Sequence, residues 1–115
     1  MTEATLRSVE SYIAAGPADA SAIVFVHGTR LTRTAWTAQL DALGDTYRVI
    51  AMDLPGHGSL ADRRFTIADA ADELARVIEN AAGGRAVVVG LSLGGYVAMD
   101  LAARRPELIR GLVLS

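Results

Sequence analysis

The apolar residues of this chain gather in short runs that alternate with longer stretches in which they recur periodically. The runs lie at 22–26 (AIVFV), 47–52 (YRVIAM), 86–89 (AVVV) and 109–114 (IRGLVL). The run at 86–89 is β-branched and too short for a core helix, which is typical of a strand buried on both faces, as in a parallel sheet. We therefore predict a strand at each run, and one or two further short strands within 4–14, before Gly16-Pro17 breaks the chain.

Three of the longer stretches predict helices, because their apolar residues fall on one helical face. The first face consists of Trp36, Leu40 and Leu43, with Thr32 or Thr34 as the N-cap and Gly44 as the stop. The second helix begins at Thr66, at capping-box spacing from Asp69, and ends at Gly83-Gly84; its apolar side consists of Ile67, Ala70, Leu74, Val77, Ile78 and Ala81. The third face consists of Leu93, Val97 and Leu101, and its helix ends at Arg104, Arg105 and Pro106.

Strands that alternate with helices predict an α/β fold, a mostly parallel, doubly wound sheet with right-handed crossovers. No linker or internal repeat divides the 115 residues, so we expect one domain. In such sheets ligands bind beyond the carboxyl ends of the strands.

Composition narrows the class of protein. The apolar fraction of 51% indicates a folded globular chain, and the net charge of −2, with its signs interspersed, argues against nucleic acid or a membrane surface as a partner. The pairs Arg63-Arg64 and Arg104-Arg105 are expected to be solvated. The absence of cysteine excludes disulfides, thiolate metal sites and a cysteine nucleophile, and we expect no metal or other cofactor.

The amino-terminal stretch MTEATLRSVE does not resemble a secretory signal, and no stretch approaches the about 18 apolar residues of a spanning helix. We therefore expect a cytoplasmic protein.

The strongest chemical signal is the turn Gly90-Leu91-Ser92-Leu93-Gly94 between the third run and the third helix. A G-x-S-x-G turn needs glycines, because the serine backbone is strained and its neighbours approach other backbone closely; Gly90, Gly94 and Gly95 meet that need. The serine hydroxyl then lies where free helix N–H groups can stabilise negative charge. The alternative is a serine that merely caps the helix.

Two further stretches accompany this turn in the same order as in a known family: Val24-Phe25-Val26-His27-Gly28 and Asp53-Leu54-Pro55-Gly56-His57-Gly58. With these three motifs the chain resembles the serine branch of the α/β-hydrolase fold family. The resemblance covers the chain from about Ser21 onward, but only the amino-terminal half of the family's domain, so 1–115 is predicted to be a partial domain truncated after the strand that follows the nucleophile helix.

The resemblance implies Ser92 as nucleophile and the backbone N–H groups of Thr29 and Leu93 as the oxyanion hole. The Thr29 hydroxyl adds a third donor or makes a local turn bond. The remaining motif residues are implied to be structural: His27, Gly28, Asp53, Gly56, His57, Gly58, Gly90, Gly94 and Gly95. The family's strand order would be 47–52, 22–26, 86–91, 109–114, which places the Gly28-Thr29 turn beside Ser92. The triad acid and histidine of the family follow later strands.

Two hypotheses remain for function. One is a serine hydrolase that acts on a small-molecule ester, thioester or related carbonyl through an acyl-enzyme. The other is a catalytically silent fragment or small-molecule-binding module of the same fold. Dinucleotide binding fits poorly, because residues 90–95 lack G-x-G-x-x-G and no phosphate loop is present.

Overall fold

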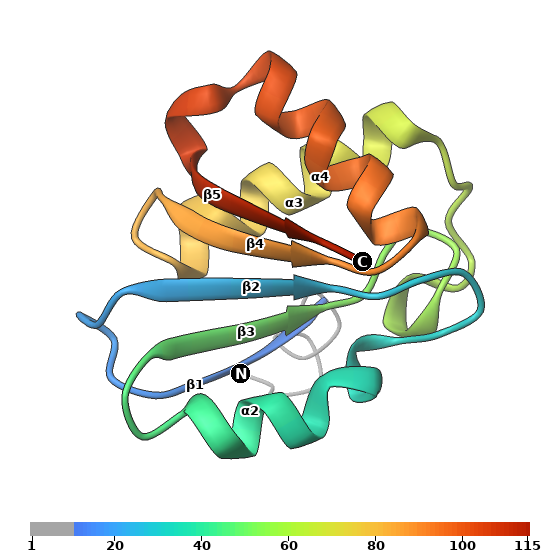
Figure 1. The fold of residues 1–115 in the computed structure, drawn as a ribbon. Coiled ribbons are helices and arrows are strands. Elements are labelled where there is room, and N and C mark those ends of the chain that lie inside the picture. The colour runs from blue at the N-terminus through green and yellow to red at the C-terminus, as the bar shows by residue number, and fades with distance from the viewer. Residues whose placement is uncertain (1–10) are drawn as a thin grey trace, which may run out of the picture.

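In the computed structural model, which describes residues 11–115, five strands form one sheet in the order β1-β3-β2-β4-β5 (Figure 1). The strands are β1 (Tyr12–Ala15), β2 (Ala22–Val26), β3 (Arg48–Met52), β4 (Ala86–Gly90) and β5 (Ile109–Leu114). Strands β3, β2, β4 and β5 are parallel, and β1 pairs antiparallel with β3. The predicted mostly parallel sheet and its strand order are therefore confirmed. Of the predicted strand region 4–14, residues 4–10 lie outside the described part of the chain.

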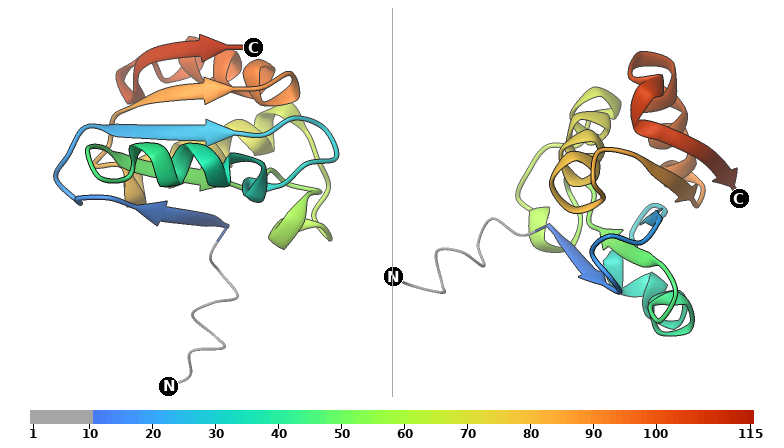
Figure 2. Two further views of the ribbon diagram at one scale, coloured as in Figure 1. Left: turned by 60° about the horizontal axis from the view of Figure 1, so that its bottom comes forward. Right: turned by 90° about the vertical axis from the view of Figure 1, so that its left-hand side faces the viewer.

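Helices cover both faces of the sheet, as Figure 2 shows from two sides. The helices are α2 (Thr37–Leu43), α3 (Ile67–Ala81) and α4 (Leu93–Arg104), with short 3-10 turns η1 (Arg33–Trp36), η2 (Gly58–Leu60) and η3 (Pro106–Leu108). The larger core joins α3 and α4 to one face of the sheet through residues such as Ile50, Met52, Leu74, Ile78, Val97 and Leu101. A smaller core of Phe25, Leu40, Val49 and Ala51 lies under α2 on the other face. The doubly wound architecture is confirmed.

The prediction that the strand at 86–89 is buried on both faces is correct for only one face. Ala86 and Val88 are buried under α3 and α4, but Val87 and Val89 on the opposite face are only half-buried. The reason is that α2 packs mainly on β3, so within the described residues it leaves this part of the sheet partly open. Burial on both faces depends on what covers the sheet, which a strand's own residues do not specify.

The helix ends follow local signals. The Thr66 hydroxyl accepts a 3.0 Å hydrogen bond from the Asp69 N–H, and Gly83 and Gly84 adopt φ of 72° and 91°, so α3 begins and ends where predicted. The predicted helix at 36–43 differs, because its first turn is the separate 3-10 turn η1, capped by Thr32.

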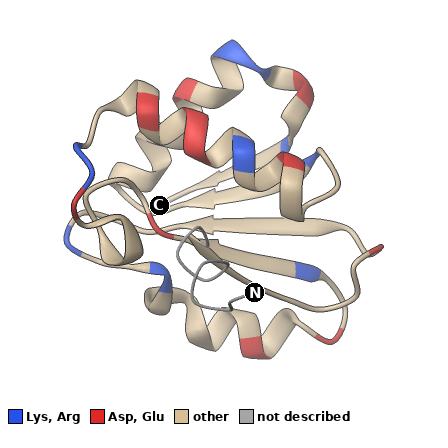
Figure 3. Ribbon diagram, turned by 180° about the vertical axis from the view of Figure 1, so that it is seen from behind, with Lys and Arg blue, Asp and Glu red and all other residues tan. Residues whose placement is uncertain are grey.

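Charged residues lie mainly on helices and loops (Figure 3). Arg104 and Arg105 are partly exposed, as expected, but both are ion-paired: Arg104 contacts Asp100 at 2.6 Å within α4, and Arg105 contacts Glu79 of α3 at 3.1 Å. Such surface pairs contribute about 1 kcal/mol or less each. None of the helices in the described part is long and apolar enough to cross a membrane.

Candidate active site

Ser92 lies between the end of β4 and the first residue of α4, with φ 53° and ψ −112°, a backbone conformation that L residues rarely adopt. The N–H of Leu91, the preceding residue, donates to Val26 O at 3.0 Å, and the Ser92 N–H donates to Ser115 O at 2.8 Å, so the turn is held from both neighbouring strands. The Ser92 hydroxyl makes no capping bond to α4. The interpretation of Ser92 as an ordinary N-cap therefore lacks its defining hydrogen bond.

Two of the three glycines around Ser92 are needed for space. A Cβ on Gly90 would lie 2.7 Å from Gly94 O and from Gly95 N, and a Cβ on Gly94 would collide with Val26 O and lie 2.7 Å from His27 O. At Gly95 the nearest atom would be 3.5 Å away, which is ordinary contact. The steric need expected at Gly95 is therefore absent, while α4 can approach β2 only because Gly94 has no side chain.

The loop after β2 lies against this turn. A Cβ on Gly28 would lie 3.3 Å from Leu91 O and 3.6 Å from Ser92 Cβ. Within residues 11–115 the backbone N–H groups of Thr29 and Leu93 have no protein acceptor, and the Thr29 hydroxyl does not make the expected turn bond. One of these unpaired N–H groups, that of Leu93, follows Ser92 directly and lies at the positive end of α4. The other, that of Thr29, follows Gly28, which lies against the Ser92 turn.

His27 is fully buried and anchors the start of that loop. Its Nδ1 lies 2.8 Å from Gly28 O, and its Nε2 lies 3.0 Å from Leu54 N. Because a carbonyl only accepts and an N–H only donates, Nδ1 carries the proton and Nε2 is the acceptor, which assigns a neutral imidazole. Burial lowers the pKa of His27, and the nearby His57 lowers it further, against the opposing effects of the Gly28 carbonyl and Asp53. Both ring nitrogens are occupied, so His27 is not available to Ser92 as a base.

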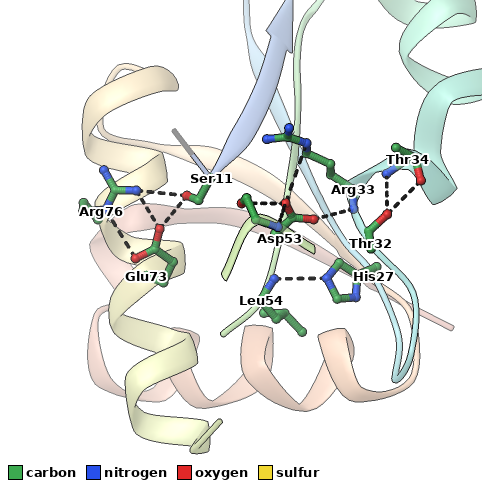
Figure 4. A network of polar contacts seen from close by, with 10 residues as sticks. Ser11, His27, Thr32, Arg33, Thr34, Asp53, Leu54, Glu73 and Arg76 are labelled. Atoms are coloured by element: carbon green, nitrogen blue, oxygen red, sulfur yellow. Dashed lines mark hydrogen bonds and ion pairs between the residues drawn. The ribbon is translucent and has the colours of Figure 1, made fainter. Parts of the chain in front are cut away.

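Asp53 anchors the end of the same loop. Its carboxylate is 1% exposed; Oδ1 accepts from Arg33 N at 2.8 Å, and Oδ2 accepts from the N–H and hydroxyl of Ser59 at 3.0 and 2.8 Å. Gly58, with φ 54°, fits only without a side chain, because its Cβ would lie 2.5 Å from Asp53 Oδ1. Figure 4 shows Asp53 between the two loops. The family resemblance implied a structural role for Asp53, but sequence reasoning did not identify Arg33 and Ser59 as its partners.

The other motif residues belong to the turn after β3. Gly56, with φ 84°, donates from its N–H to Leu60 O at 2.8 Å. The ring of His57 lies 5.0 Å from that of His27 between centroids, and its Nδ1 lies 3.1 Å from Pro55 O. Through the contact between these two rings, the turn after β3 packs against the start of the loop after β2.

A hollow of about 350 Å³ opens beside Ser92, between the first turns of α4 and the end of β5. It is lined by Ser92, Gly95, Tyr96, Met99, Leu114 and Ser115. None of these residues has a histidine, aspartate or glutamate side chain. In the described part of the chain, no group of three or more His, Asp or Glu side chains could hold a metal ion.

Comparison with known proteins agrees with this geometry. Residues 23–115 match the alpha/beta hydrolase family. The chain is 37% identical over 92 residues to a pimeloyl-[acyl-carrier protein] methyl ester esterase of Nitrosomonas europaea, covering 80% of this chain and 35% of that protein. It is 38% identical over 95 residues to an esterase of Mycobacterium tuberculosis, covering 80% of this chain and 31% of that protein.

Among solved structures, a thermophilic esterase of Thermogutta terrifontis superposes with a TM-score of 0.78 at 34% identity, covering 90% of this chain and 39% of that one. The chain thus spans well under half the length of each of these proteins. With the family match over most of its length and the same fold in its structural neighbour, the chain belongs to the alpha/beta hydrolase family.

Proposed function

We propose that Ser92 is the nucleophile of a serine hydrolase that cleaves a small-molecule ester, thioester or related carbonyl compound through an acyl-enzyme. The Leu93 and Thr29 N–H groups hold the oxyanion, and the triad acid and histidine come from a longer protein that contains residues 1–115. The observation that carries the proposal is the strained, uncapped Ser92 at the start of α4, with the unpaired Leu93 N–H directly after it and with Gly28, the residue before Thr29, lying against the same turn.

The chemistry follows from this arrangement. Ser92 Oγ attacks the carbonyl carbon while its proton passes to the histidine, and the carbonyl oxygen takes up negative charge facing the two N–H groups. The tetrahedral intermediate collapses, the alcohol or thiol leaves with that proton, and water then hydrolyses the acyl-enzyme. The names of the esterase relatives support an ester substrate.

The test uses the longer parent protein and compares Ser92→Ala with Ser115→Ala, a second serine that lines the same hollow. Ser92→Ala should lower kcat on the best ester by about a thousandfold or more, whereas Ser115→Ala should leave most of the activity. If Ser92→Ala keeps more than about a tenth of the parent's activity, the nucleophile assignment is wrong. If the parent itself neither turns over esters nor reacts with a fluorophosphonate, the silent or binding-module alternative is correct.

A further inference from the structure

Four polar or charged side chains are buried among residues 11–115: Ser11, His27, Asp53 and Glu73. His27 and Asp53 belong to the motifs of the site. Ser11 and Glu73 belong to no motif, and they come from distant parts of the chain, before β1 and within α3. Buried polar groups are costly unless they are hydrogen-bonded, so their partners indicate what they hold in place.

Glu73 is bonded to Ser11. Its Oε2 accepts from the Ser11 hydroxyl at 2.5 Å and from Arg76 Nη2 at 2.6 Å, and its Oε1 lies 3.5 Å from Arg63 Nη1. Burial raises the pKa of Glu73, but the hydrogen bonds from Arg76 and Ser11 and the charges of Arg76 and Arg63 outweigh it, so that the pKa lies below its ordinary value. Glu73 is therefore a charged group at neutral pH, only 6% exposed.

Ser11 connects this carboxylate to the site. The Ser11 carbonyl accepts the Asp53 N–H at 2.8 Å, and Asp53 Oδ1 accepts the Arg33 N–H at 2.8 Å. The next N–H along the chain, that of Leu54, donates to His27 Nε2. Figure 4 shows Ser11 with Glu73 and Arg76, Asp53 with Arg33, and Leu54 with His27 close to one another, and the bond from the Asp53 N–H to the Ser11 carbonyl joins the first group to the second.

The two ends of that loop, at Gly28 and Arg33, are thus attached to the consecutive residues 53 and 54. Thr29, the proposed oxyanion donor, lies between these ends. Because residue 53 is itself bonded to Ser11, a continuous series of hydrogen bonds connects the loop to the Ser11 and Glu73 pair.

We propose that Glu73 is a positioning residue of the oxyanion loop and acts through Ser11 and Asp53. This inference rests on the proposed role of Thr29. Without the carboxylate, the Ser11 hydroxyl loses its acceptor, the backbone at Ser11, and with it its bond to the Asp53 N–H, loosens, and the Asp53 carboxylate holds the Arg33 N–H less firmly.

Amide hydrogen exchange measured by NMR on the 115-residue chain tests the structural part of this inference. The variants are Glu73→Gln and the milder Ser11→Ala, which keeps the backbone bond to Asp53. The control is Glu79→Gln, which alters an exposed carboxylate on the same helix that is also paired with an arginine. We expect both variants to speed exchange at the Arg33 and Ser59 amides about tenfold relative to the Val88 amide in β4, and the control to change it less than about twofold.

Faster exchange confined to β1 and α3, or equal acceleration at Val88, would overturn the inference, because the network would then serve local or global stability alone. Should Glu73→Gln fail to fold, amide exchange at Arg33 and Ser59 in Ser11→Ala tests the inference in the same way.

In the longer parent, Glu73→Gln should lower kcat several-fold with little change in KM, because the oxyanion bond forms only in the transition state. If loop exchange rises without a change in kcat, the network is real but Thr29 is not the oxyanion donor. This result would separate failure of the proposed function from failure of the network.

Discussion

The backbone N–H of Ser92 donates a 2.8 Å hydrogen bond to the carbonyl oxygen of Ser115, the residue that follows β5. In return the Ser115 N–H donates to Gly90 O at 3.0 Å, so the ladder between β4 and β5 continues beyond the last residue of each strand. The unusual backbone conformation of Ser92 is therefore fixed by a neighbouring strand as well as by its glycines. A strained residue persists only where its surroundings over-determine it.

Ser115→Pro should loosen the Ser92 turn, because proline has no N–H to donate to Gly90 O. We expect the free energy of unfolding to fall by about 1 kcal/mol and the Ser92 amide to exchange faster. Ser115→Ala keeps both backbone bonds and should leave that amide unchanged. Urea unfolding and amide exchange measure the two effects. An unchanged Ser92 amide in the proline variant would mean that the β5 end does not fix this turn.

Gly94→Ala and Gly95→Ala, two identical changes at adjacent positions of α4, should differ sharply. At Gly94 the new methyl group would collide with Val26 O, and we expect a loss of about 3 kcal/mol or more in the free energy of unfolding. At Gly95 there is room for it, and because alanine favours a helix by about 1 kcal/mol over glycine, the variant should be as stable as the parent chain or slightly more so. Urea unfolding of the two variants checks this difference. Similar losses in both would contradict the close approach of α4 to β2.

The contrast between these glycines marks the limit of what the sequence could predict. The strands, helix ends and strand order follow from apolar runs, caps and a family resemblance, all of which can be recognised from residues close in sequence. The space around Gly94 and Gly95 depends on residues of β2 and β5, which lie far away in sequence. The sequence alone therefore does not distinguish the two glycines.

The sequence contains one indication of the Glu73 network, which is the position of Glu73 on its helix. Glu73 lies three residues after Ala70 and four before Val77, in the middle of the apolar face of α3. A carboxylate at such a position is buried and needs partners. Its partner Ser11 and the link from Asp53 to Arg33 could not be deduced, because they join segments 62 and 20 residues apart.

Folding stability should fall as the pH drops below about 6.5 because of His27. The unfolded chain takes up a proton near the ordinary pKa of 6.5, whereas burial keeps the folded His27 neutral to lower pH. The unfolded state therefore binds more protons in this range, and the free energy of unfolding decreases. Glu73 contributes only below its ordinary pKa of 4.5, where the loss of its ionised form adds to the effect.

Urea unfolding between pH 5 and 8 measures the His27 effect without overlap from Glu73. In His27→Gln the decrease between pH 6.5 and 5 should be smaller. An identical pH profile in that variant would show that another group is responsible.

The 115-residue chain should self-associate through β5. Val113 and Leu114 are 52% and 47% exposed at an edge of the sheet, beside Tyr96 at 63%. Exposed apolar edge strands pair with other chains, and a lysine at the edge prevents this. Val113→Lys should therefore lower the mass measured by light scattering at high concentration, whereas Tyr47→Lys, at the other end of the molecule, should not. Association that Tyr47→Lys abolishes equally would indicate a general effect of charge.

Ser92 in the 115-residue chain should resist labelling by a fluorophosphonate, although Ser92 is an exposed residue. A serine hydroxyl is a weak nucleophile at neutral pH unless a base accepts its proton. The chain has two histidines; both ring nitrogens of His27 are bonded to backbone groups, and His57, whose Nδ1 lies against Pro55 O, does not line the hollow beside Ser92. Intact mass spectrometry should find almost no adduct on this chain, and a nearly complete one on the longer parent protein. Stoichiometric labelling of Ser92 in the short chain would mean that a base is already present, and loss of that labelling in His57→Ala would identify it.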